Sequence, residues 1–145
     1  MKSAVLPALA VAWSMAAAAE TPSSLLGHYR SAPKKVCQPG GDGHRAVCSR
    51  LADALRIERS GFEGRRDVKV TAEFNLPDSQ ICSFEGTGYW IAEGRRLVVA
   101  DTRTGCEMSL VAETRVLRSI VIRPDQCNSP CAGRTWLEGV VLRRK

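Results

Sequence analysis

Apolar residues recur at every second position in several short stretches of this chain, which is the pattern of a β-strand with one buried face. The clearest example is residues 68–75, where polar residues alternate with Val68, Val70, Ala72 and Phe74. Residues 106–113 repeat the pattern with Cys106, Met108, Leu110 and Ala112. A helix would space its apolar residues three and four apart, so the alternation favours an all-β fold.

Further stretches have strand composition and are bounded by Gly, Pro, Asp or Asn. They are residues 25–30, 54–59, 81–90, 95–101, 116–123 and 135–143. With the two alternating stretches they make about eight short strands, which predicts a single antiparallel barrel or a strongly curved sheet, stabilised by disulfides. Closure would also remove exposed strand edges. The spacing of Leu51 and Leu55 allows a turn or two of helix at residues 49–55.

The first 19 residues have the organisation of a secretory signal peptide. Lys2 gives a positive start, residues 4–16 are apolar, and residues 17–19 are all alanine, which suits cleavage before Glu20. The apolar stretch is shorter than the roughly 20 residues that span a membrane. We therefore expect residues 20–145 to form one barrel-like domain in the periplasm or outside the cell, without membrane insertion.

Basic residues outnumber acidic ones. The chain carries a net charge of +6, and removal of the segment with Lys2 leaves +5. The basic residues are mostly arginines spread in ones and twos, whereas a nucleic-acid site needs a concentrated patch, usually with stacking aromatics. No nucleic-acid partner is therefore expected. The charge instead favours attraction to an anionic surface or an acidic protein.

Six cysteines follow the predicted signal peptide, and an even number in an exported protein indicates disulfides. Fifteen pairings are formally possible. Closeness in sequence favours Cys37–Cys48 and Cys127–Cys131, which leaves Cys82–Cys106. In the predicted strand register Cys82 and Cys106 both point toward the core, which is consistent with a disulfide between strands.

The Cys127–Cys131 pair also has to be weighed as a reactive site. Redox enzymes use Cys-x-x-Cys at the start of a helix, but here three residues intervene and a strand is expected to follow. A zinc site needs four ligands, and no second closely spaced Cys or His pair accompanies this one. We predict a small loop closed by a structural disulfide, with no metal and no cofactor.

No residue pattern predicts an enzyme. A cysteine nucleophile needs a free thiol and a base, and the only histidines are His28 and His44. The glycine-rich residues 40–44 lack the Gly-Lys-Ser/Thr ending of a phosphate-binding loop, so a flexible loop closed by Cys37–Cys48 is expected. The carboxylates mostly occupy polar strand positions or turns, and the Gly-x-Ser-x-Gly signature of serine hydrolases is absent.

Parts of the chain resemble known protein groups. Residues 25–29, Leu-Leu-Gly-His-Tyr, resemble the Gly-x-aromatic start of the first strand in small lipocalin-like barrels. The cysteine spacing of residues 82–142 is similar to that of small secreted bacterial proteins of uncharacterised function. Those proteins tend to have Cys-Gly-Ala-Arg where this chain has Cys-Ala-Gly-Arg at residues 131–134.

The expected architecture also resembles that of the periplasmic inhibitors of lysozyme, which insert a loop into the enzyme's cleft. This chain lacks their Ser-Gly-x-x-Tyr loop. The interpretation favoured here is a soluble extracytoplasmic binding protein that acts through protein–protein contact. Its expected form is an inhibitor of, or immunity protein against, a cell-wall hydrolase or secreted toxin. The alternative is a small-ligand carrier of the lipocalin type that uses the barrel interior.

Two segments are the candidate partner contacts. Gly86-Thr87-Gly88 predicts a bulge or tight bend within a strand, and Tyr89-Trp90 follows it directly. The alternative for these two rings is packing inside the barrel or at its rim. The second segment, Arg134 to Trp136, would be held near a barrel end by the Cys127–Cys131 loop. The predicted contact residues are Thr87, Tyr89, Trp90, Arg134 and Trp136.

Peptide mapping of the unreduced protein by mass spectrometry tests the disulfide assignment. We expect the pairs Cys37–Cys48, Cys82–Cys106 and Cys127–Cys131, with no thiol that reacts before reduction. A free thiol at Cys127 or Cys131 would contradict the structural role given to that pair.

Overall fold

The computed structural model describes residues 19–61, 66–77, 79–101, 103, 105, 107–113, 116–122 and 139–145. The elements are η1 (Ser23–Leu25), β1 (Gly27–Arg30), β2 (Lys34–Gln38), β3 (Val47–Leu51), β4 (Ala54–Arg59), β5 (Val68–Asn75), β6 (Ile81–Ile91), β7 (Arg96–Ala100), β8 (Glu107–Glu113), β9 (Val116–Ile122) and β10 (Val141–Arg144). No helix in these ranges is long and apolar enough to cross a membrane.

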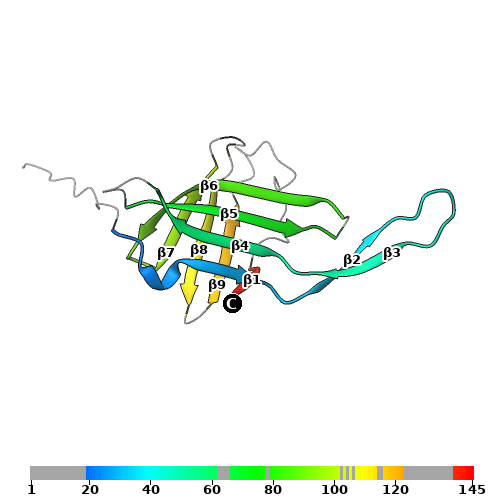
Figure 1. The fold of residues 1–145 in the computed structure, drawn as a ribbon, viewed down its shortest axis with the longest axis horizontal. Helices are drawn as coiled ribbons and strands as arrows, with labels where there is room; N and C mark the ends of the chain where they lie inside the picture. The colour runs from blue at the N-terminus through cyan, green and yellow to red at the C-terminus, as the bar shows by residue number, and fades with distance from the viewer. Residues whose placement is uncertain are drawn as a thin grey trace, which may run out of the picture.

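Eight antiparallel strands close into a barrel in the order β1-β10-β9-β8-β7-β6-β5-β4, with β4 pairing back to β1 (Figure 1). Strands β2 and β3 form a separate two-stranded sheet. The predicted all-β barrel of about eight strands is therefore confirmed. Residues 1–18, which contain most of the predicted signal peptide, and residues 123–138 lie outside the described residues.

Seven of the strands expected from the sequence correspond to strands of the barrel, with small shifts at their ends. The last, expected at residues 135–143, is described only as β10 (Val141–Arg144), and residues 135–138 lie outside the described residues. The first begins at Gly27 because residues 23–25 form a 3₁₀ turn. The helical turn expected at residues 49–55 is wrong. Residues up to Leu51 pair with β2, and residues from Ala54 onward pair with β1 and β5, so β-ladders satisfy the backbone groups there.

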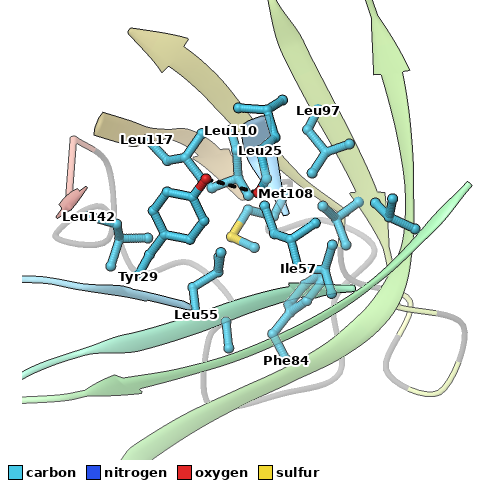
Figure 2. Packing of buried hydrophobic residues seen from close by; sticks show 14 of the residues in the cluster. Leu25, Tyr29, Leu55, Ile57, Phe84, Leu97, Met108, Leu110, Leu117 and Leu142 are labelled. Carbon is cyan, nitrogen blue, oxygen red and sulfur yellow. Dashed lines mark hydrogen bonds between the residues drawn. The ribbon is translucent and has the colours of Figure 1, made fainter. Parts of the chain in front are cut away.

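Alternate side chains of the barrel strands fill its interior, as the period of two predicts. The burial of β5 alternates strictly between buried and more exposed positions. Leucines, valines, Met108 and aromatic rings from every side of the barrel meet in one cluster (Figure 2). Residues with no exposed surface include Val68, Val70, Phe74, Leu97, Val99, Met108, Leu110 and Leu142. The described part of the interior is therefore a packed core.

The 3₁₀ turn η1 lies against the side chain of Tyr29. The Tyr29 hydroxyl donates a hydrogen bond of 2.8 Å to the Leu25 carbonyl (Figure 2). Burial raises the pKa of Tyr29, and the nearby Arg144 guanidinium only partly opposes this. The phenol therefore keeps its proton at neutral pH and remains the donor. Arg144 adds a hydrogen bond of 3.0 Å to the Ser24 carbonyl, so both bonds attach η1 to the barrel.

The glycines of β6 allow close packing and do not mark a bulge. The register of β6 runs without interruption against both β5 and β7, and the register shift of the barrel lies instead between Ser109 and Leu110 of β8. A Cβ atom on Gly86 would lie 2.2 Å from the Ala100 carbonyl oxygen. On Gly88 it would press on core side chains at 3.0–3.2 Å. The predicted bulge is therefore wrong, and the physical requirement at Gly86 is the approach of the next strand.

Replacing Gly86 by alanine tests this packing. A methyl group there meets backbone atoms that cannot rotate away, so we expect Gly86→Ala to lower the free energy of unfolding by about 2–3 kcal/mol. Gly41→Ala is the control, because nothing lies within 4 Å of a Cβ built on Gly41. Urea unfolding followed by circular dichroism measures both. Equal midpoints for the two variants would contradict the close approach.

Candidate functional site

The β2–β3 hairpin extends away from the barrel (Figure 1). Its strands pair from Lys34–Leu51 at the base to Gln38–Val47 near the loop. All five residues of β3 are exposed, and so are loop residues 41–46. An isolated two-stranded hairpin is marginal in water because it buries little apolar surface. The order of this hairpin therefore depends on specific anchors.

One anchor is the disulfide between Cys37 and Cys48, which confirms the pairing predicted from the sequence. The two residues face each other in the ladder, with their Cα atoms 4.0 Å apart. The bond joins the strands next to the loop and reduces the conformations open to the unfolded segment. The loop predicted to be closed by this disulfide is thus the end of a cross-linked hairpin.

The second anchor is a polar network at the base of the hairpin, centred on the buried carboxylate of Asp53. Lys34 donates to one of its oxygens at 2.8 Å, and the Asn75 backbone N–H donates to the other at 2.8 Å. The Asp53 backbone N–H donates to the Ser31 hydroxyl at 2.8 Å, and the Asn75 amide donates to the Ala52 carbonyl at 3.0 Å. These bonds tie both ends of the hairpin to the barrel strands β4 and β5.

The hairpin has two different faces because side chains alternate along each strand. One face carries Lys35, Arg50 and the disulfide, and the other carries Val36, Val47 and Leu51. Val47 is 71% exposed and Leu51 is 39% exposed, whereas Val36 is buried. The same face also carries Lys34, Gln38 and Ser49, so the exposed apolar side chains of Val47 and Leu51 lie among polar ones.

This face continues onto the turn between β5 and β6. A pocket of about 190 Å³ is lined by Val36, Gln38, Val47, Ser49, Leu51, Asn75, Ser79 and Ile81. Ile81 is 55% exposed. We call the surface formed by Val36, Val47, Leu51 and Ile81 the apolar groove. It contains three of the four exposed large hydrophobic residues of the described chain, and the fourth is Tyr89.

The hairpin is also strongly basic. Lys34 is paired with Asp53, but Lys35, Arg45 and Arg50 form no ion pair with a described residue. The acidic residue of the hairpin is Asp42, in the loop. The hairpin therefore offers several uncompensated positive charges, with Lys35 and Arg50 on the face opposite the apolar groove and Arg45 in the loop.

A larger hollow of about 770 Å³ lies over strands β1, β4, β5 and β6. Exposed side chains that alternate with core residues line it, among them His28, Arg56 and Glu85. Arg56 pairs with Glu58, and Glu85 pairs with Lys69 at 2.8 Å, which raises the pKa of Lys69. The lining also includes Arg30, Arg103, Arg144 and Lys145 but only one further acidic residue, Glu73, so the hollow has an excess of positive charge. No cluster of metal-ligating side chains occurs within the described ranges.

Of the five predicted contact residues, Thr87, Tyr89 and Trp90 are described and lie on β6. Tyr89 is 48% exposed and Thr87 is half-buried, but Trp90 packs in the core and its backbone pairs with Ala19. Arg134 and Trp136 lie outside the described residues. The burial of Trp90 fits the alternative of packing inside the barrel. The contact role of Thr87, Tyr89, Trp90, Arg134 and Trp136 stays a prediction.

The remaining cysteines are only partly described. Cys82 is fully buried beside the Phe84 position and is disulfide-bonded, as the strand register predicts. Cys106, Cys127 and Cys131 lie outside the described residues. The pairings Cys82–Cys106 and Cys127–Cys131 therefore stay predictions.

Comparison with family models, curated proteins and solved structures finds no match to this chain. The hairpin must therefore be interpreted from its own residues. Sequence reasoning missed it because an element exposed at nearly every position has no buried face to reveal its period. The available signal was the pair Cys37 and Cys48, placed symmetrically around a glycine-rich turn.

Removing the Asp53 carboxylate tests the basal anchor. Asp53→Ala leaves the Asn75 N–H without its acceptor and Lys34 without its partner, so we expect a loss of about 2 kcal/mol in unfolding free energy. We also expect faster tryptic cleavage at Lys35, Arg45 and Arg50, because the hairpin opens more often. Glu73→Ala, an exposed acidic residue on β5, is the control. Unchanged cleavage in Asp53→Ala would contradict an anchoring role.

Proposed function

We propose that this protein is an extracytoplasmic binding protein that acts through protein–protein contact, with the β2–β3 hairpin as its contact element. The observation that carries this proposal is the combination of exposure and anchoring. Strand β3 and the loop before it are exposed, yet a disulfide and the Asp53 network hold the hairpin in one arrangement. Pre-organisation of this kind lowers the entropy lost when a partner binds.

The charge of the hairpin supports an acidic partner. Lys35, Arg45 and Arg50 are not neutralised within the described chain. Unpaired cations on a projecting element accelerate encounter with an acidic surface and disfavour basic partners.

The form of function that fits best is an inhibitor of, or immunity protein against, a cell-wall hydrolase or secreted toxin. Enzymes that hydrolyse glycosidic bonds carry a pair of carboxyl groups in a cleft. A narrow basic hairpin is complementary to such a cleft in shape and charge. Because this chain is itself basic, the proposed target is an acidic enzyme or toxin and not a basic lysozyme.

The alternative of a small-ligand carrier has less support. Core side chains, including Val70, Val99 and Met108, fill the described interior. Val70, Val99 and Met108 line none of the pockets of about 770, 510, 440 and 190 Å³, although other core residues, among them Tyr29 and Phe84, line the pocket of about 770 Å³. A lipocalin-type ligand would need a chamber where these side chains pack.

Affinity capture tests the proposed function. The purified protein is immobilised and exposed to envelope extracts and to purified hydrolases and secreted toxins, at low and high salt. We expect recovery of an acidic protein that is released as the salt concentration rises. The double variant Arg45→Glu/Arg50→Glu should weaken its binding by about tenfold or more.

The matched control is Arg96→Glu/Arg143→Glu, which makes the same change in net charge on exposed barrel strands. It should retain most of the binding. Equal loss in both double variants would show that total charge, and not the hairpin, governs the interaction. Failure to recover any protein partner would contradict the proposed function itself.

A further inference from the structure

The apolar groove is an unusual feature of this surface. Val47, Leu51 and Ile81 expose large hydrophobic side chains within one pocket of about 190 Å³. Exposed apolar side chains that gather in one place, with polar neighbours around them, mark interaction sites. Val36, at the floor of the same groove, is already buried by its neighbours. The groove is therefore partly formed before any partner arrives.

The shape of the groove suits an extended polypeptide. One face of the hairpin forms its floor, and Asn75, Ser79 and Ile81 from the β5–β6 connection form its side. Strands β2 and β3 pair with each other and with no other strand in the described chain, so each has an outer edge available for backbone hydrogen bonds. Peptides that add to such an edge gain affinity from backbone hydrogen bonds and specificity from pockets that take alternate side chains.

The charges of the hairpin select among the possible occupants of the groove. Arg45 directly precedes β3, and Lys35 and Arg50 lie on the two hairpin strands. A second copy of this chain would bring the same positive charges to the contact, which is unfavourable. A lipid surface would satisfy the charges, but it presents no single side chain to a walled pocket of this size.

We infer that the apolar groove binds an extended segment of an acidic partner protein, with a large apolar side chain seated between Val47 and Ile81. Side chains of a strand added to the hairpin edge alternate between the two faces, so Asp or Glu residues of that segment lie near Lys35 or Arg50 on the opposite face, or near Arg45 in the loop. The inference rests on the proposed function, because it specifies which part of a protein partner the hairpin region recognises.

Selection from a displayed library of short random peptides tests this inference. The purified protein is the bait, and the variant Val47→Ser/Ile81→Ser is used for counter-selection. Enriched peptides should combine one large apolar residue with flanking Asp or Glu. For an enriched peptide, Val47→Ser and Ile81→Ser should each weaken binding by about tenfold, because each removes burial of one apolar side chain.

Both replaced residues are exposed, so neither change should alter the fold, and urea unfolding checks this. Val98→Ser is the matched control, since Val98 is a partly exposed hydrophobic residue of β7 outside the groove. The enriched peptide should bind this control variant as tightly as it binds the parent protein. Replacing the acidic residues of the peptide by Lys should abolish binding, and vesicles of phosphatidylglycerol should not compete.

Several results would overturn the inference. These are enrichment of basic or uncharged peptides, binding that survives Val47→Ser and Ile81→Ser, competition by the vesicles, or no enrichment beyond the counter-selecting variant. The proposed function is judged separately by affinity capture. A captured partner could also bind the Val47→Ser/Ile81→Ser variant with the same affinity as the parent protein. That result would support the proposed function but contradict the role given to the apolar groove.

Discussion

Closure of the barrel depends on the short strand β1, which pairs with β10 on one side and β4 on the other. The contact with β10 joins the first and last strands of the chain through few residues, with the Lys145 N–H donating to the His28 carbonyl at 3.0 Å. Once the ring is closed, every barrel strand has a neighbour on each side. Strand edges, which readily pair with other chains, are thereby largely removed from the barrel.

The hairpin is the exception to this closure, and its position between β1 and β4 explains why. These two strands are adjacent in the barrel, so the segment joining them needs to span only one strand spacing. The chain instead continues outward as β2, turns, and returns as β3. Because the hairpin buries little apolar surface, directional bonds to Asp53 and the Cys37–Cys48 disulfide hold it in place. A closed barrel thus carries one ordered element with available edges.

The sequence predicted the barrel better than the element that projects from it. The alternation of Val68, Val70, Ala72 and Phe74 reports a buried face, and a buried face is what hydrophobic periodicity detects. Strand β3 is exposed throughout and has no such signal. The bulge predicted from the glycines of β6 was wrong for a related reason. The sequence shows that Gly86 has no side chain, but it does not show which neighbour occupies the free space, and that neighbour is the Ala100 carbonyl.

Local patterns alone determined the fold class, the approximate strands and the Cys37–Cys48 pair, because alternation, turn residues and short cysteine spacing are properties of neighbouring positions. Only the tertiary structure decided how residues distant in sequence combine. Asp53 meets Lys34 and the Asn75 backbone, and Ile81 joins Val47 and Leu51, because antiparallel pairing brings the hairpin base beside the β5–β6 connection. The apolar groove and its anchors form only in that arrangement. They could not be predicted from the sequence, because contacts between distant residues produce no periodic pattern.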